Sequence, residues 1–263
     1  MTISNYFDYE TDIARLHLIP LLLRHGALSG PIRVLDVGCG YGGTLFALTE
    51  AVPGVRGQGL DVDASMVRQG RERLGEAATL IHANFFEWSG GPFELILMRD
   101  VLEHIGQPEQ ALAKASALLT PRGFLYASFA PFFGPFGGHQ HNASGFCSYI
   151  PWLQILPTPY VRRILTVRGN SYKTTLELKQ DLESVFATRL TLRRFRRAAA
   201  AAGLRCRSEA GYLSRPDYRV KFGWPPIRLP SLPGLSEMLA TGFEALMQRH
   251  QPVGNPGKGD VVS

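Results

Sequence analysis

Short apolar runs alternate with stretches of helical periodicity along the first half of the chain. Apolar runs that end in glycine or acidic residues are typical of strands in a parallel sheet covered by helices on both faces. The pattern predicts strands at 32–37, 55–61, 79–83, 93–98 and 124–129, with helices at 44–51, 64–74 and 108–119 between them. Asp63 directly precedes one of these helices and is a good N-cap for it.

The alternation stops after the fifth predicted strand. Residues 130–172 are rich in proline, glycine and aromatic side chains, and this stretch is too long for an ordinary connection. We interpret it as an inserted lid or substrate-binding segment. The pattern then predicts helices at 174–187 and 191–202, a strand at 204–212, a proline-rich loop, a last helix at 235–249 and a frayed tail at 254–263.

These elements predict a doubly wound α/β fold with a mostly parallel, seven-stranded sheet and helices on both faces. We expect one domain over residues 1–263. Within it, residues 30–130 form the cofactor-binding half and residues 131–188 form an inserted lid or substrate segment after strand five.

Composition adds the expected location of the protein. Apolar residues make up 45% and charged residues 19%, an ordinary globular mixture. The longest apolar stretch near the start, residues 18–23, is too short to span a bilayer, and the acidic residues before it suit no signal peptide. Cys39, Cys147 and Cys206 form no CxxC pair, so neither a zinc site nor a disulfide framework is expected. We predict a cytoplasmic protein without a membrane span.

The chain is basic, with a net charge of +6 and a pI near 9.4. Much of the excess is arginine in the segment 189–197. No RNA-binding signature accompanies this cluster, so a solvated helix face is favoured over a nucleic-acid patch.

Candidate chemistry begins with the glycine-rich loop after the first strand, in the run from Val34 to Gly43. Gly38, Gly40 and Gly43 let the backbone turn sharply and allow a ligand to lie against it. Their spacing also satisfies the dinucleotide-binding pattern, so a NAD-dependent dehydrogenase is an alternative. Asp36 argues against that alternative, because its carboxylate would repel a pyrophosphate but attract an ammonium and a sulfonium.

The run Asp36-x-Gly-x-Gly-x-Gly after an apolar strand resembles the first motif of the class I S-adenosylmethionine-dependent methyltransferases. Asp61 closes the second strand, where the family's acidic residue bonds both ribose hydroxyls. Asn84 stands where the family has the acid that binds the adenine amino group, and the neighbouring Phe85 could pack on the adenine face.

Two further segments extend the resemblance, which covers residues 32–130. Residues 98–104 resemble the segment after strand four, which commonly ends Leu-Glu-His. Residues 119–124 resemble a Leu-x-Pro-Gly-Gly turn, with Arg122 replacing the first glycine. The resemblance implies S-adenosylmethionine as the cofactor and methyl transfer as the reaction. The cofactor-binding residues expected from it are Asp36, Gly38, Cys39, Gly40, Asp61, Val62, Asn84, Phe85 and Arg99.

Three histidines are candidates for the general base that would deprotonate an oxygen acceptor. His139 and His141 lie in the insertion, and His104 ends the Leu-Glu-His segment. An imidazole with an ordinary pKa near 6.5 suits this role. The His-x-His pair also suggests a metal, but no carboxylate stands near it in the sequence. The metal-dependent catechol-type enzymes carry Asp-Asn where this chain has Ser128-Phe129-Ala130, so we expect no metal.

The segment after strand four also bears on the acceptor. Enzymes that methylate base amino groups carry Asn/Asp-Pro-Pro-Tyr there, whereas this chain has residues 99–102 as Arg-Asp-Val-Leu, and no Pro-Cys nucleophile occurs. We therefore expect no nucleic-acid partner. The predicted acceptor is a small molecule such as a natural product or sugar, most often methylated on oxygen. The alternatives are an RNA methyltransferase and a non-catalytic protein that binds S-adenosylmethionine. The sequence gives neither the acceptor's identity nor the oligomeric state.

Overall fold

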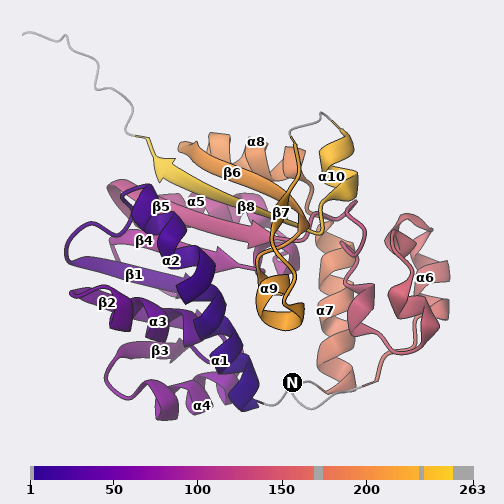
Figure 1. Ribbon diagram of the computed structural model, residues 1–263, viewed down its shortest axis with the longest axis horizontal. Coiled ribbons are helices and arrows are strands. Elements are labelled where there is room, and N and C mark those ends of the chain that lie inside the picture. The colour runs from indigo at the N-terminus through magenta and orange to yellow at the C-terminus, as the bar shows by residue number, and fades with distance from the viewer. Residues whose placement is uncertain (1–2, 169–173, 231–233, 251–263) are drawn as a thin grey trace, which may run out of the picture.

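The computed structural model describes residues 3–168, 174–230 and 234–250. In this part of the chain one eight-stranded sheet runs in the order β3-β2-β1-β4-β5-β8-β6-β7. The first five strands of that order are parallel, and the remaining pairings are antiparallel. The predicted doubly wound, mostly parallel α/β fold is confirmed (Figure 1). The sheet has eight strands where seven were predicted, and neither β8 nor the two-residue strand β7, which pairs with β6, was among the strands located from the sequence.

The elements follow the predicted alternation closely up to the fifth strand. The strands are β1 Ile32–Val37, β2 Val55–Asp61, β3 Ala78–His82, β4 Phe93–Arg99, β5 Leu119–Phe129, β6 Leu204–Ser214, β7 Ile227–Arg228 and β8 Gly242–Arg249. The helices are α1 Ile3–Ile13, α2 Ile19–Arg24, α3 Gly43–Ala51, α4 Ala64–Leu74, α5 Pro108–Leu118, α6 Thr158–Ile164, α7 Thr175–Thr188, α8 Leu192–Ala201, α9 Asp217–Phe222 and α10 Leu235–Leu239. A π-helical turn, Ala14–Leu18, joins α1 to α2.

Successive residues of the central strands enter two separate apolar cores. Val34 and Leu95 pack with α1, α2 and α3 on one face, whereas Leu35 and Ile96 pack with α5 and α8 on the other. All four side chains are fully buried. A strand buried on both faces needs apolar residues at every position, which is why these runs are continuous rather than alternating.

Local signals at the helix ends behave as their chemistry predicts. The Asp63 carboxylate accepts hydrogen bonds from the backbone N–H groups of Ser65 (2.8 Å) and Met66 (3.0 Å), so the predicted N-cap is confirmed. Gly203 adopts φ +71° after α8, as expected for a residue that ends a helix.

The predicted last helix at 235–249 is wrong. Only Leu235–Leu239 is helical, and Gly242–Arg249 forms β8, which lies between β5 and β6. Leu, Ala, Met and Glu favour helices in isolation, but burial on both faces overrides that preference here. Glu244 tolerates this buried position because it accepts hydrogen bonds from His17, Tyr126 and Tyr212.

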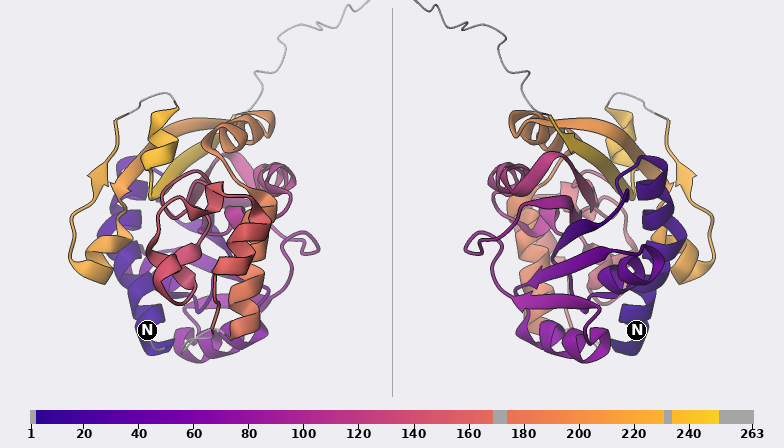
Figure 2. Two further views of the ribbon diagram at one scale, coloured as in Figure 1. Left: turned by 90° about the vertical axis from the view of Figure 1, so that its right-hand side faces the viewer. Right: turned by 90° about the vertical axis from the view of Figure 1, so that its left-hand side faces the viewer.

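The carboxyl ends of the parallel strands face the insertion, residues 131–188. In Figure 1 the arrows of β4 and β5 point toward the side where α6 and α7 lie, and Figure 2 shows this segment in front of the strands when that side is viewed. The insertion is held by buried amides: Gln154 donates to the carbonyls of Phe132 and Gly134, and Gln140 donates to Pro135 and to the Gln154 side-chain oxygen. The described residues between β5 and α8 thus lie beyond the carboxyl ends of the strands, and their assignment as a lid or substrate segment stays a prediction.

The arginine cluster near α8 is partly neutralised within the protein. Arg194 pairs with Glu109 at 2.6 Å and Arg196 with Glu209 at 2.8 Å. These pairs fit the interpretation as a solvated helix face. Across the three described segments, no helix is both long and apolar enough to cross a bilayer. The tail predicted at 254–263 lies outside the described residues.

Candidate active site

The loop after β1 has a backbone that only glycine adopts readily. Gly38, Gly40 and Gly42 have φ of +73°, +53° and +83°, in the left-handed region. A Cβ on Gly38 would overlap the side chain of Val101, which follows β4, and a Cβ on Gly43 would overlap the carbonyl oxygen of Phe7 in α1. The loop is therefore packed against both the end of β4 and the N-terminal helix.

Asp61, at the end of β2, braces this loop. Its Oδ2 accepts the N–H of Gly40 at 2.8 Å, and its Oδ1 accepts the N–H of Asp63 at 2.9 Å. A carboxylate oxygen has two acceptor positions, so each oxygen can accept one further hydrogen bond. The two predicted residues Gly40 and Asp61 are thus brought into direct contact, with acceptor capacity left for a ligand.

Two buried acids, Asp36 and Glu10, lie near Arg99 beside the loop. Asp36 is 3% exposed, and burial raises its pKa to about 7, although Arg99 opposes the shift. Glu10, from α1, is also buried, and burial raises its pKa to about 8. Among the described residues the Glu10 Oε2 atom has no hydrogen-bond partner. Arg99 donates to Thr44 Oγ1 at 2.5 Å. The site therefore has more acidic than basic groups and suits a cation.

Glu10 was missed by sequence reasoning. A Cβ on Gly40 would lie 3.5 Å from Glu10 Oε1, so this carboxyl group stands directly over the predicted cofactor loop. One glutamate in an N-terminal helix carries no motif, and nothing short of the packing of α1 on α3 could have revealed it.

The remaining predicted cofactor residues lie around the same edge. Val62 is 69% exposed, and Asn84 Oδ1 accepts the N–H of Phe86 at 2.9 Å. Phe85 is buried in the core beneath Lys114, and Phe86 is the exposed ring of the pair. Their roles in adenine binding stay predictions.

Cys39 turns its thiol into the protein. A Cβ on Gly59 of β2 would lie only 2.6 Å from its Sγ atom, so the thiol fills the space beside that strand. Burial raises the pKa of the Cys39 thiol, which keeps it protonated. Any contact of Cys39 with a cofactor is therefore made by its backbone.

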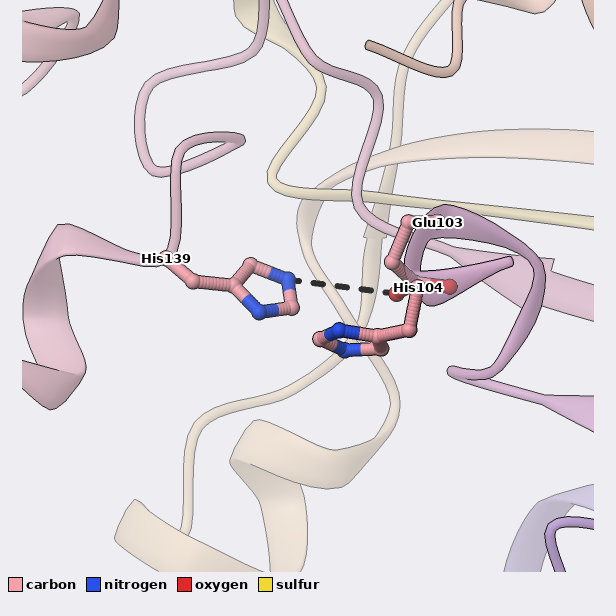
Figure 3. A group of neighbouring side chains, drawn as sticks. All are labelled: Glu103, His104 and His139. Carbon is pink, nitrogen blue, oxygen red and sulfur yellow. Dashed lines mark ion pairs between the residues drawn. The ribbon is translucent and has the colours of Figure 1, made fainter. Parts of the chain in front are cut away.

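The insertion brings His139 to the short turn that follows β4 (Figure 3). His139 Nε2 lies 3.9 Å from Glu103 Oε1, and the His104 and His139 ring centroids are 5.0 Å apart. His104 Nδ1 lies 2.8 Å from Ser184 Oγ in α7. We call these three residues, Glu103, His104 and His139, the Glu–His–His cluster.

Glu103 was not predicted as a site residue, although it stands in the Leu-Glu-His segment. It is 1% exposed, its Oε1 accepts the N–H of Ala130 at 3.4 Å, and its Oε2 has no partner in the described part of the chain. Burial raises the pKa of Glu103 well above its usual range. The segment after β4 therefore carries a buried carboxyl group with a raised pKa, in addition to Asp36 and Glu10 beside the glycine-rich loop.

His141, the third candidate base, lies beside the cluster rather than in it. Its ring centroid is 5.6 Å from that of His139. Desolvation, and after it the charges of Lys221 and Arg215, lower the pKa of His141 to about 4. A base of that strength accepts a proton weakly at neutral pH, so His139 and His104 are the stronger candidates.

Ion pairs close the site on the side of β6. Asp100 has φ +50° and accepts two hydrogen bonds from Arg215 Nη2, at 2.7 and 2.8 Å, while Arg215 Nε donates to Asp217 at 2.7 Å. Although burial alone would raise it, Arg215 lowers the pKa of Asp100. A small pocket beside these ion pairs is also lined by His17, Arg99 and Glu244.

Comparisons with known proteins agree with this geometry. Residues 35–125, which hold the glycine-rich loop, Asp61 and the Glu103 segment, match the family of methyltransferase domains. Residues 35–125 therefore carry a methyltransferase domain. The cofactor of this domain is S-adenosylmethionine, as the sequence predicted.

Individual relatives match this chain over different lengths. Trans-aconitate 2-methyltransferase of Paracidovorax citrulli is 35% identical over 107 residues, which cover 40% of this chain and 41% of that protein. An uncharacterized methyltransferase of Mycolicibacterium gilvum is 25% identical over 228 residues, 85% of this chain and 78% of that one. The match thus spans less than half the length of the first relative.

A solved structure extends the fold comparison over most of the chain. Magnesium protoporphyrin IX methyltransferase from Synechocystis PCC 6803, solved with bound S-adenosylhomocysteine, superposes with a TM-score of 0.53 and 17% identity, covering 89% of this chain and 80% of that one.

The residues of the loop fit S-adenosylmethionine. The cofactor carries an α-ammonium, a sulfonium and a ribose diol. Asp36 and Glu10 supply buried carboxyl groups beside the glycines, whose charged form a bound cation would stabilise, and among the described residues Glu10 Oε2 lacks a partner; Asp61 supplies acceptors for hydroxyls. When bound, the cofactor supplies an electrophilic methyl group; the protein's residues bind and orient it.

We expect Asp61→Ala to weaken binding of S-adenosylhomocysteine by about 1.5–3 kcal/mol, because it removes charge-assisted hydrogen bonds. Calorimetry measures this directly. Asp63→Ala is the matched control, since Asp63 only caps α4. That variant should lose about 1 kcal/mol of stability and keep its affinity. Equal affinities for the two variants would contradict the role of Asp61.

Glu10 should also make the stability of the cofactor-free protein depend on pH. Its folded pKa of about 8 is above its ordinary value, so the folded state holds a proton that the unfolded state releases between about pH 4.5 and 8. Glu10 therefore lowers stability as pH rises through that window, by up to about 1.4 kcal/mol per pH unit.

We expect Glu10→Gln to remove this contribution and to be more stable than the wild type at pH 8. Denaturant unfolding at pH 5 and pH 8 measures the difference. Asp12→Asn, at an exposed position of the same helix, should retain the wild-type dependence. A Glu10→Gln curve parallel to the wild type at both pH values would show that Glu10 does not titrate in this way.

Proposed function

We propose that the protein transfers the methyl group of S-adenosylmethionine to an oxygen of a small-molecule acceptor. In this proposal residues 30–130 bind the cofactor and the insertion, residues 131–188, binds the acceptor. One observation carries it: the segment that contacts the glycine-rich loop through Val101 also holds the Glu–His–His cluster, which the insertion completes with His139. The cofactor loop and the cluster are therefore neighbours at the carboxyl end of β4.

Methyl transfer is an in-line displacement that needs the acceptor atom about 3 Å from the methyl carbon. The protein's tasks are to orient the acceptor, to exclude water and, for a hydroxyl acceptor, to promote loss of its proton. Phe132 is buried in the wall of the insertion, and Phe133 is 43% exposed. An apolar wall of this kind suits the body of a small organic acceptor. In this proposal the reacting oxygen of the acceptor lies beside the cluster.

The relatives support a small-molecule acceptor, since one is named for trans-aconitate and a structural neighbour for a porphyrin. An RNA methyltransferase is the second candidate, on the basic charge of the chain alone. In the basic segment 189–197, Arg194 and Arg196 form ion pairs within the protein, which favours a small-molecule acceptor over RNA.

The test follows the label from methyl-labelled S-adenosylmethionine. The purified protein is incubated with a small-molecule extract in one arm and total RNA in the other, and the labelled product is identified by mass spectrometry. We expect label in a small molecule as an O-methyl group. Label in RNA, or binding of NAD in place of S-adenosylhomocysteine by calorimetry, would overturn the proposal.

A further inference from the structure

We propose that Glu103, His104 and His139 form a binding site for one divalent transition-metal ion, such as Zn²⁺. The proposal deepens the proposed function, on which the ion's role toward the acceptor rests. Binding of the ion itself stands on the geometry of the cluster.

The three side chains already lie close together. One ligand atom of each residue falls within 4.8 Å of those of the other two, and the closest printed pair, His139 Nε2 and Glu103 Oε1, is 3.9 Å apart. Atoms that bind one zinc ion at about 2.0–2.2 Å lie roughly 3–3.5 Å from one another. Side-chain movements of about 1 Å would bring the three ligand atoms to the distances that one ion requires.

The donor set suits a transition metal and leaves room for a substrate. Two imidazoles and one carboxylate bind Zn²⁺ or Fe²⁺ on one side of the ion, with further coordination positions open. Figure 3 shows the three side chains converging from two separate segments, His139 from one and the adjacent pair Glu103 and His104 from the other. An acceptor oxygen could take an open position.

Glu103 is an independent sign of a missing ligand. Its side chain is 1% exposed, and Oε2 has no hydrogen-bond partner within the described ranges. A buried carboxyl oxygen without a partner costs free energy, and a cation is the partner that such an atom accepts best.

His104 is oriented as metal-binding histidines usually are. Its Nδ1 lies 2.8 Å from Ser184 Oγ, so Nε2 is the nitrogen that would bind an ion. Ligating histidines commonly engage their second nitrogen in a hydrogen bond that fixes the ring. Ser184, in α7, also belongs to the insertion, so both His139 and the support of His104 come from it.

The backbone of the loop that holds His139 is fixed by close packing. His139 has φ +54°, in the left-handed region that few residues other than glycine adopt. A Cβ on Gly137 would overlap the carbonyl oxygens of Pro131 and Phe132, and one on Gly138 would overlap Gln154. Strain at a residue that the surrounding packing holds in place is common at ligand-binding positions.

The charges around the cluster allow a cation to enter. Arg215, whose charge acts on Glu103, is paired with both Asp100 and Asp217. A metal ion that binds the Glu103 carboxyl group would displace its proton, as metal ligands require. The expectation of no metal rested on the absence of a carboxylate near His139 in the sequence; in the fold Glu103 is that carboxylate.

The experiment is a titration of chelator-treated protein with Zn²⁺, followed by calorimetry. The wild type should bind one ion with a dissociation constant in the micromolar range or below. Glu103→Gln keeps the shape of the side chain and removes its charge, and His139→Ala removes a ligand. Each should weaken binding by about 10- to 100-fold or more. Co²⁺ added in place of Zn²⁺ should give visible absorption that both variants lose.

His141→Ala is the matched control, because it removes a histidine two residues from His139 and outside the cluster. It should bind Zn²⁺ like the wild type. Affinity for S-adenosylhomocysteine, measured on every variant, verifies that each is folded. Absence of Zn²⁺ binding by the wild type, or equal binding by the wild type, Glu103→Gln and His139→Ala, would overturn the metal site.

The two proposals fail in different ways. If the wild type binds no metal but still methylates a small molecule, the metal site is wrong and the proposed function stands. If it binds one ion through the cluster but labels only RNA, the metal site stands and the proposed acceptor is wrong.

Discussion

Gly40→Val is expected to abolish binding of S-adenosylhomocysteine while leaving the protein folded. The nearest neighbours of a Cβ at Gly40 would be side chains, Glu10 Oε1 at 3.5 Å and Tyr6 Cε1 at 4.0 Å, so the free protein has room for a larger residue. The added isopropyl group would instead occupy the face of the loop on which the cofactor's methionine part lies. We expect a loss of at least about 100-fold in affinity, equal to roughly 2.7 kcal/mol, by calorimetry.

Gly75→Val is a close control for this substitution. Gly75 follows α4 and has the same φ, +53°, with no atom within 4 Å of an added Cβ. Both variants place a β-branched residue at a positive φ, so both should unfold at lower denaturant concentrations than the wild type. Only Gly40→Val should lose the cofactor. Retained affinity in a folded Gly40→Val protein would mean that the cofactor lies elsewhere.

The cofactor half of the fold could be predicted because its signals are local. Asp63 caps its helix through its own neighbours, and the glycines of the loop announce a backbone that other residues avoid. Asp61 and Gly40 are far apart in sequence, but the ends of adjacent parallel strands necessarily meet at one edge of the sheet. A resemblance of motifs then located most of the candidate cofactor residues.

The last strand could not be predicted from its own residues. Residues 242–249 favour a helix by composition, and their strand conformation depends on β5 and β6 on either side. The charge of Glu244 is tolerated only because His17 and two tyrosines, from three different elements, donate to it. At Arg122 the structure explains why the family has a glycine. The residue has φ +68°, a backbone conformation that glycine adopts most readily.

The Glu–His–His cluster was only partly visible in the sequence. His104 and His139 were separate, competing candidates for one base, and no periodicity relates residues 35 positions apart. The fold joins them because strands four and five are adjacent and the insertion returns over their ends. Glu103 was hidden for another reason: a buried acid in a short turn is usually satisfied by backbone groups, and only the unpartnered Oε2 sets it apart.

His139→Ala is expected to lower turnover by about 100- to 10,000-fold while leaving affinity for S-adenosylhomocysteine nearly unchanged. The cofactor loop follows β1 and contacts Asp61 of β2 and the helix α1, whereas His139 comes from the insertion. Single-turnover rates with saturating cofactor separate the chemical step from cofactor binding. His139→Asn repeats the test with a residue that tolerates the left-handed backbone at φ +54°, so loop strain alone cannot explain a shared loss.

The same measurement distinguishes two roles for the imidazole. If His139 acts as a general base, the wild-type rate decreases at pH values below the pKa of that histidine, and the variants lose this decrease. A chelator then has no effect on the rate. If His139 holds a metal ion, a chelator should reduce the wild-type rate to that of His139→Ala, and added Zn²⁺ should restore the wild type alone. Wild-type turnover in both variants would exclude both roles, and would leave His104 as the predicted residue to replace next.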